Sequence, residues 1–154
     1  MPKKRHDILP VIDVLLALAK IKRHTNLIKS ALDLAEDEST YDVMVTQLGL
    51  IGESIKKILN FKEFQEIANR KWRVIGDFRN VLAHNYSGID LEEFFHIIKI
   101  EVPLFEKEFF DFVRKIKNHP DFPKAINDAK IELEKSGQRK SLQSIPFIEK
   151  LLKP

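Results

Sequence analysis

The residue types best suited to chemistry lie within eight positions, R-N-V-L-A-H-N-Y, from Arg79 to Tyr86. Arginine offers a rigid fork of donors that matches phosphate oxygens, and it can stabilise the added charge of a phosphoryl transition state. Histidine titrates near neutral pH and acts as a general acid or base. Because RNA carries its own nucleophile, the 2′-hydroxyl, Arg79 and His84 suffice in principle to cleave a phosphodiester by transesterification without a metal.

A structural interpretation of the same residues stays open. One arginine and one histidine on a helix are commonplace, and His84 could simply donate to carbonyl groups near a helix C-terminus. The sequence contains no HExxH motif and no cluster of carboxylates and histidines with ligand spacing, so we expect no metal and no other cofactor. The remaining histidines have no comparable neighbours and are interpreted as surface or structural residues: His6, His24, His96 and His119.

These eight residues end a predicted helix over residues 69–86. At about 100° per residue, a polar stripe runs along its far side through Arg73, Asp77, Asn80 and His84. The opposite arc should face the core. Its members are Val74, Ile75, Phe78, Val81 and Leu82.

Arg79 lies at the other margin of the apolar face, about 140° from His84 on the same wheel. Gly76 and Ala83 fall between Arg79 and the polar stripe. Two long polar side chains therefore flank a strip with almost no side-chain bulk. A phosphate group, or the same strip of a second protomer, could approach closely there. If the helix persists to Tyr86, its ring joins the Arg79 margin.

Apolar residues recur at helical spacing along the chain, and no alternating run is long enough to predict a strand. Only five glycines interrupt the 154 residues, which favours long helices. We therefore predict an all-α fold, an antiparallel bundle of four to five main helices with a C-terminal helical extension. Besides residues 69–86, the predicted helices span 7–24, 25–35 (a continuation or a second short helix), 61–68 and 122–135.

Two further helices are predicted from their caps. Residues 36–39 indicate a solvated loop, with Ser39 capping the next helix. Asp90 with Glu93 opens another helix, which Pro103 should kink or break. Both helices carry an apolar stripe, interpreted as core and not as a platform for stacking bases. The stripes are Met44, Leu48, Ile51, Ile55 and Ile58, then Phe94, Ile98, Val102, Phe105, Phe109, Val113 and Ile116.

Composition narrows the class of protein. The absence of cysteine excludes disulfides, thiolate catalysis and cysteine-based zinc sites. No apolar run approaches the ~20 residues of a membrane span, and Asp13 interrupts the first apolar stretch, so we expect a cytoplasmic protein without a signal peptide. The net charge of +3 reflects either ordinary surface lysine or a mild bias toward RNA. We assign residues 1–120 to the bundle and 121–154 to an extension that docks on the bundle or a partner.

The motif resembles that of a known family. Arg79, His84 and Tyr86 form the R-x4-H-x-Y pattern, and the chain resembles HEPN-domain proteins of the HepT-like group. Trp72 upstream and the Gly52-Glu53 pair in the preceding long helix add to the resemblance, which covers about residues 7–116.

The resemblance implies a helical bundle that dimerises to join two R-x4-H motifs in one RNA-cleaving cleft. It implies a metal-independent endoribonuclease, the toxin of a toxin–antitoxin pair, with Arg79 and His84 catalytic. Asn80 and Asp77 would be supporting polar residues. The antitoxin of this group is a minimal nucleotidyltransferase that transfers AMP to the motif tyrosine, here Tyr86.

Two other functions stay open at this point. A HEPN-like bundle can serve as a non-catalytic module that binds a nucleotidyltransferase partner. A helical scaffold could also bind RNA through its basic surface without using Arg79 or His84. Glu53, beside the apolar stripe of its helix, either faces a functional surface or is a solvated helix residue.

Overall fold

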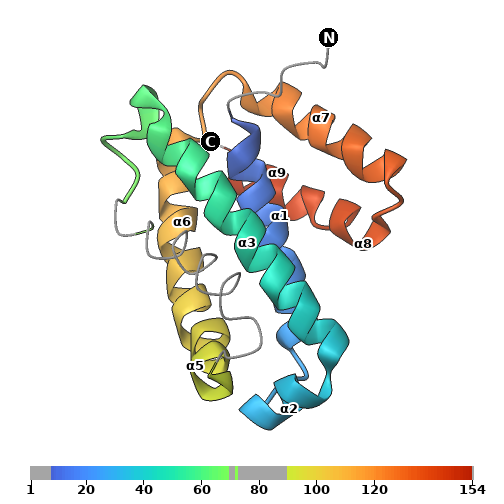
Figure 1. The fold of residues 1–154 in the computed structure, drawn as a ribbon. Helices are drawn as coiled ribbons and strands as arrows, with labels where there is room; N and C mark the ends of the chain where they lie inside the picture. Colours follow the sequence, from blue (N-terminus) through green and yellow to red (C-terminus); the bar gives the residue numbers. More distant parts are fainter. Residues whose placement is uncertain (1–7, 70–71, 73–89, 154) are drawn as a thin grey trace.

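The computed structural model describes residues 8–69, 72 and 90–153. Within these ranges every regular element is helical and none is a strand, so the predicted all-α class is confirmed. Helices α1 and α3 run antiparallel, and α5 and α6 rise beside α3 in the same direction as α3 (Figure 1). The elements are α1 (Leu9–Thr25), α2 (Ala31–Glu36), α3 (Glu38–Asn60), η1 (Lys62–Phe64), α5 (Leu91–His96), η3 (Ile97–Glu101), α6 (Val102–Ile116), α7 (Phe122–Lys135), α8 (Arg139–Leu142) and α9 (Ile145–Leu151).

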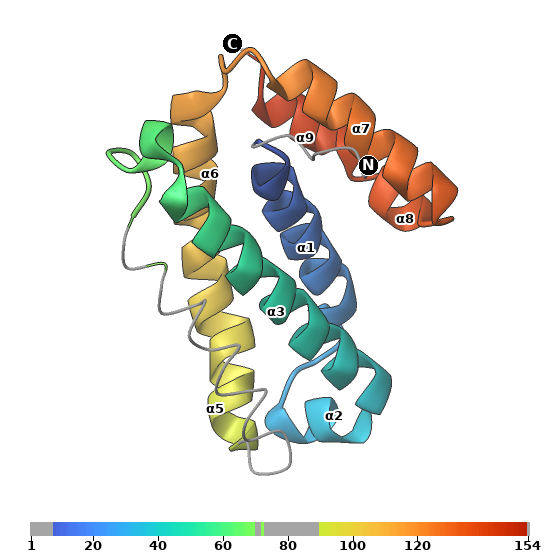
Figure 2. The same ribbon diagram turned by 45° about the horizontal axis from the view of Figure 1, so that its top comes forward.

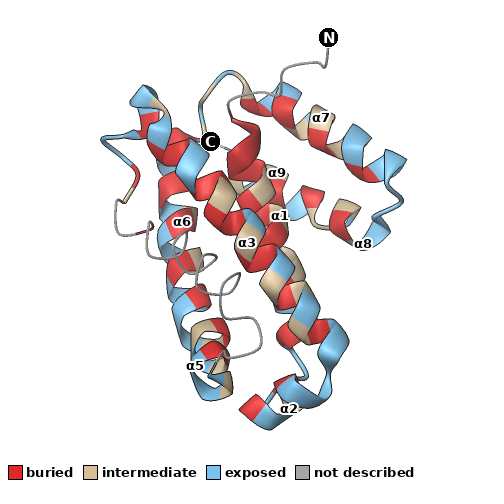
Figure 3. Ribbon diagram, in the orientation of Figure 1, coloured by how far each residue is buried: buried red, intermediate tan, exposed pale blue. Residues whose placement is uncertain are grey.

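Helix α1 lies at the centre, between α3 on one side and α7 to α9 on the other (Figure 2). Its apolar residues surround the helix and do not form a single stripe, and most are buried (Figure 3). Pro10 falls in the first turn, where its missing N–H leaves no hydrogen bond unmade. The predicted helix over residues 7–24 is therefore confirmed, and its wide apolar face reflects contact on several sides.

The junction between α2 and α3 differs from the prediction. Residues 36–39 form no loop, because α2 ends at Glu36 and α3 begins at Glu38. Asp37 caps α3: its Oδ1 accepts from the Thr40 amide at 3.0 Å and its Oδ2 accepts from the Thr40 hydroxyl at 2.7 Å. Ser39 is thus inside the helix and is not its cap. The Asp37 carboxylate satisfies the free Thr40 amide at the start of α3, so α3 can follow α2 without an intervening loop.

Residues 61–68 form only the single turn η1 and not the predicted helix. The backbone of Phe61 is extended, with φ −78° and ψ 124°, and this ends α3. Phe64 is then buried edge-on against Phe112 of α6, with ring centroids 5.7 Å apart. Burial of one large aromatic ring outweighs the weak helical preference of a short segment.

Helices α5 and α6 form one continuous helical rod with a wider turn, η3, between them. The Val102 amide donates to the Ile97 carbonyl five residues earlier, the bond of a π turn. Pro103 follows directly and has no amide to donate, so the predicted irregularity at Pro103 is confirmed. The apolar stripe of this rod is buried throughout, as predicted for core residues: Phe94, Ile98, Val102, Phe105, Phe109, Val113 and Ile116.

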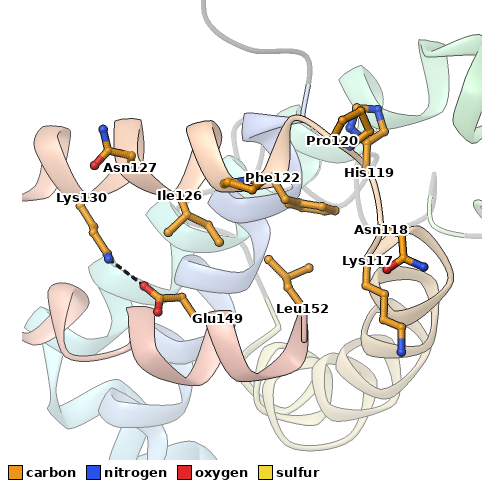
Figure 4. Close-up of a pocket in the computed structure, with 11 residues that line it drawn as sticks. Lys117, Asn118, His119, Pro120, Phe122, Ile126, Asn127, Lys130, Glu149 and Leu152 are labelled. Atoms are coloured by element: carbon orange, nitrogen blue, oxygen red, sulfur yellow. Dashed lines mark ion pairs between the residues drawn. The ribbon is translucent and has the colours of Figure 1, made fainter. Parts of the chain in front are cut away.

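The last three helices form a layer over α1. Helix α7 has the bounds predicted for a helix over residues 122–135, and Gly137, at φ +70°, turns the chain into α8. Ile145 and Ile148 bury α9 in the core, while Lys130 of α7 pairs with Glu149 of α9 at 2.7 Å (Figure 4). The division of the chain at residue 120 stays a prediction.

No helix within residues 8–69 and 90–153 combines the length and apolar character that a membrane crossing requires.

Glu106 is a half-buried carboxylate on α6. Burial raises the pKa of its carboxyl above the usual value, and the Lys22 ammonium on α1 opposes that shift only in part. A carboxyl whose pKa is higher in the folded state binds its proton more tightly there, so its ionisation at neutral pH lowers the stability of the fold.

We therefore expect Glu106→Gln to raise the Tm at pH 7.5 by about 1–3 °C. The difference should shrink as the pH falls and vanish below about pH 4, where the carboxyl is neutral in both the folded and the unfolded states. Thermal unfolding followed by circular dichroism measures both effects. The exposed Glu134 of α7 provides the control, because Glu134→Gln should leave Tm unchanged. A lower Tm for Glu106→Gln would contradict the burial argument.

Candidate functional site

The predicted site residues lie in the segment 73–89, outside the part of the chain that the structure describes. Their roles stay predictions, but the chain is described on both sides of the segment, at Trp72 and at Asp90. The contacts of these two flanks determine how the segment is attached to the bundle. The residues concerned are Asp77, Arg79, Asn80, His84 and Tyr86.

Trp72 fixes the start of the segment. Its side chain is buried, 3% exposed, against three phenylalanines of α6. The ring centroids of Phe105, Phe109 and Phe112 lie 5.6, 5.4 and 5.3 Å from that of Trp72, mostly at steep interplanar angles. Steeply inclined aromatic pairs place the positive edge of one ring on the negative face of the other. Arg79 follows this anchor by seven positions in the sequence.

Glu108 supplies the polar part of the same anchor. Its Oε2 accepts a hydrogen bond from the indole Nε1 of Trp72 at 3.1 Å, and a second, longer one from the Asn69 amide at 3.5 Å. A buried indole N–H needs such an acceptor, since it would otherwise lose its bond to water without replacement. Sequence reasoning missed Glu108 because one exposed glutamate on a helix carries no signal of its partner.

Asp90 fixes the end of the segment. Its Oδ1 accepts from the amides of Glu92 and Glu93 at 2.9 and 3.2 Å, so it caps α5 as predicted. The next turn of α5 packs against α3, where the rings of Phe94 and Tyr41 have centroids 4.9 Å apart. Both flanks of the predicted site are therefore attached to the rigid bundle.

The Gly52-Glu53 pair lies elsewhere on α3. Gly52 is buried, and Glu53 is half-buried at the edge of a groove formed with α1, α7 and α8. The structure thus places Glu53 on a concave surface and not on a fully solvated face. Sequence reasoning raised this possibility but named no other residue of the groove.

Within residues 8–69 and 90–153, together with Trp72, no three histidine, aspartate or glutamate side chains lie close enough to share a metal ion. The described part of the site is an aromatic and hydrogen-bonded support. It can position a segment of chain, and the predicted catalytic residues lie in that segment.

The single tryptophan makes the Glu108 contact measurable. We expect Glu108→Ala to destabilise the protein by about 1 kcal/mol, because the indole N–H loses its acceptor, and to change the Trp72 emission spectrum. Glu108→Gln retains an acceptor oxygen and should leave both nearly unchanged. Urea unfolding and fluorescence measure the two effects.

Asp111→Ala is the matched control for that experiment. It removes a carboxylate from α6 whose partner is the exposed Arg114, at 3.0 Å, and such surface pairs contribute little stability. Equal emission and stability in Glu108→Ala and the wild type would show that the hydrogen bond has no energetic role.

Comparison with known proteins agrees with the resemblance. The chain matches the family described as "Ribonuclease HepT-like" over residues 14–116. It is 30% identical over 86 residues to "Putative RNase TTE0752" of Caldanaerobacter subterraneus subsp. tengcongensis, covering 55% of this chain and 75% of that protein. It is 36% identical over 66 residues to "Putative RNase MJ1380" of Methanocaldococcus jannaschii, covering 42% of this chain and 59% of that protein.

A third relative, "Gamma-glutamylcyclotransferase and putative RNase MJ0434" of M. jannaschii, is 26% identical over 76 residues, which cover 49% of this chain and 33% of the relative. No solved structure matches the chain. The family match takes in two thirds of the chain, from the second turn of α1 to the end of α6, and includes the whole stretch from Arg79 to Tyr86. The chain belongs to the HepT-like ribonuclease family.

Proposed function

We propose that this protein is a metal-independent endoribonuclease that acts as the toxin of a toxin–antitoxin pair in the cytoplasm. One observation carries the proposal: the family match spans the stretch in which Arg79, His84 and Tyr86 form an intact R-x4-H-x-Y motif. The names of the relatives, which describe them as RNases, support the same class of activity.

In the proposed reaction, the 2′-hydroxyl of the substrate RNA attacks the adjacent phosphorus and the 5′-oxygen of the next nucleotide leaves. His84 removes the proton from the 2′-hydroxyl or delivers a proton to the leaving oxygen. Arg79 holds the scissile phosphate and stabilises the charge that develops on it. Asn80 and Asp77 support these residues from the polar stripe of the same segment.

We further propose that the active form is a homodimer. Arg79 and His84 flank a strip whose residues, Gly76 and Ala83, have almost no side-chain bulk. A second protomer can approach such a strip closely, and a two-fold axis would then bring both motifs to one cleft. The attachment of both flanks, through Trp72 and Asp90, supports this proposal because a composite cleft requires two well-positioned halves.

The proposed regulation acts on Tyr86. A nucleotidyltransferase antitoxin would transfer AMP from ATP to the phenolic oxygen, with release of pyrophosphate. The bulky, anionic adduct would stand two residues from His84 and would block RNA from the motif by steric exclusion and by charge repulsion.

For the nuclease, we expect His84→Ala to lower the rate of RNA cleavage in EDTA by about 10²- to 10⁴-fold, the usual contribution of a general acid or base. Cleavage of purified RNA by wild type and variant measures it, alongside growth arrest on expression. His96, an exposed histidine of α5, is the matched control, and His96→Ala should cleave at the wild-type rate.

Equal cleavage by wild type and His84→Ala would exclude this mechanism. Absence of cleavage by both, with retained binding of a nucleotidyltransferase or of RNA, would favour the alternative function, a non-catalytic HEPN-like binding module.

For the regulation, we expect intact-mass spectrometry to detect the added mass of one AMP after incubation with ATP and a cognate nucleotidyltransferase. Tyr86→Phe should abolish the adduct, because phenylalanine has no oxygen to accept the nucleotidyl group. The chain has only two tyrosines, so Tyr41→Phe is the matched control and should still be modified. Modification that persists in Tyr86→Phe would refute the assignment.

A further inference from the structure

The extension contacts α1 through an arginine that has no acidic partner among the described residues. Arg23 lies in the last turn of α1, and its guanidinium donates to the hydroxyls of Ser144 and Ser141 at 3.3 and 3.4 Å. These serines belong to the stretch that brings α8 and α9 against α1 (Figure 1). A hydroxyl orients a guanidinium but carries no charge, so the positive charge of Arg23 is not compensated there.

Partial burial makes the uncompensated charge of Arg23 costly. The side chain is half-buried, and burial lowers the pKa of its guanidinium without an opposing carboxylate among the described residues. An arginine that only attached the extension would gain more from a carboxylate, as Lys130 gains from Glu149 in the same layer. The two serines therefore hold the guanidinium in place and leave its charge for another group.

Further cations lie beside Arg23. Lys20 and His24 share its face of α1, because residues three and four apart are neighbours on a helix. Lys140 comes from α8, where it directly precedes Ser141, whose hydroxyl contacts Arg23. Four basic side chains from two helices form this surface, which we call the basic patch: Lys20, Arg23, His24 and Lys140.

The titration of His24 reflects the net charge of the basic patch. Partial burial, followed by the positive charges of the other three members, lowers the pKa of the His24 imidazole. The Asp37 carboxylate opposes that shift, and it is the one negative group that acts on His24 within the described ranges. Asp37 is itself engaged in capping α3 through Thr40. The basic patch therefore has an excess of positive charge.

A structural role explains only part of the basic patch. Arg23 and His24 lie in the last turn of α1, where the partial negative charge of the helix C-terminus favours cations. That effect does not account for Lys140, which comes from the single turn of α8. Cations from separate helices repel one another, so their meeting at one surface costs free energy unless an anion binds there.

The groups of the basic patch fit the phosphates of a nucleic acid. The arginine fork matches phosphate oxygens, and a lysine adds a point charge. A nucleic acid strand carries one negative charge per nucleotide, so it can contact several members of the patch at once. Since the chain belongs to a ribonuclease family, RNA is the polyanion favoured here over an acidic protein.

We propose that the basic patch binds the phosphate backbone of RNA, with Arg23 and Lys140 each contacting a phosphate group. The inference rests on the proposed function, because it takes RNA to be the substrate, and it adds a binding surface made of residues other than the predicted catalytic ones. Lys140 and the two serines follow residue 116, where the family match ends, so the basic patch depends on the extension.

Fluorescence anisotropy with a labelled twelve-nucleotide 2′-O-methyl RNA measures binding apart from cleavage, because this RNA lacks the nucleophilic hydroxyl. The logarithm of the affinity for a single strand falls with the logarithm of the salt concentration, with a slope of about −0.7 per phosphate contact. One lost contact therefore weakens binding about five-fold at about 0.1 M salt. We expect Arg23→Gln and Lys140→Gln each to show that loss and to reduce the slope by about 0.7, and the double variant to reduce it by about 1.4.

Lys124→Gln is the matched control for these variants. Lys124 is an exposed lysine in the first turn of α7, whereas α8 follows the other end of that helix. The 14 residues of α7 span about 20 Å, roughly twice the Debye length at about 0.1 M salt. The control should therefore keep nearly the wild-type affinity and salt slope.

The salt slope separates binding from a merely structural role. Wild-type affinity and slope in the double variant would overturn the proposal. Weaker binding by Arg23→Gln with an unchanged slope would show that Arg23 only attaches the extension, and would overturn its assignment to a phosphate. Lys140→Gln changes an exposed side chain, so it keeps the test decisive if Arg23→Gln does not fold.

Two further measurements define the ligand and separate this proposal from the nuclease. Binding of a twelve-residue polyglutamate peptide as tight as that of RNA, with the same losses in the variants, would overturn the RNA assignment. If the wild type cleaves unmodified RNA and the variants bind like the wild type, the basic patch is refuted and the nuclease stands. If the wild type cleaves no RNA and the variants still lose binding, the nuclease is refuted and the basic patch stands.

Discussion

The aromatic face of α6 is the contact on which the described structure most depends. Phe112 receives Phe64 from the turn after α3 and Trp72 from just before the predicted site, and Phe105 and Phe109 complete the cluster. Aromatic rings bury the largest areas of any side chains and prefer inclined contacts, so this cluster fixes orientation as well as position. The Glu108 carboxylate also fixes the orientation of the Trp72 ring, because one acceptor satisfies the indole N–H in a single ring orientation.

The bundle and the segment that it holds have different roles in the protein. The bundle supplies fixed attachment points at Trp72 and at the Asp90 cap, and the residues between them carry the motif. A site of this kind needs little catalytic machinery on the bundle itself. In the proposed reaction the substrate RNA supplies the nucleophile, and the proposed dimer supplies the second half of the cleft. In the proposed mechanism, Glu108 and Asp90 hold the two flanks of the segment and take no part in bond making.

The central position of α1 has a second consequence. A helix that is apolar on most of its surface requires cover on several sides, and α3 covers only one. Helices α7 to α9 cover another, which explains why Ile145 and Ile148 of the tail are as buried as the core of the bundle. The same packing places Lys140 of α8 near Arg23 of α1 and so creates the basic patch.

The sequence by itself determined the helical class, the buried stripes of α3 and α6, the Asp90 cap, the irregularity at Pro103 and the bounds of α7 at residues 122–135. Each of these depends on the spacing or backbone chemistry of residues close together in the chain. It also identified the family through a motif of eight residues, although the geometry of that motif stays a prediction. Only the tertiary structure decided that Asp37 replaces a loop, that Phe64 leaves the helical path for Phe112, and that Trp72 bonds to Glu108. Trp72 and Glu108 are 36 residues apart and Phe64 and Phe112 are 48 apart, and no local pattern encodes which distant side chain will complete a hydrogen bond or cover a ring.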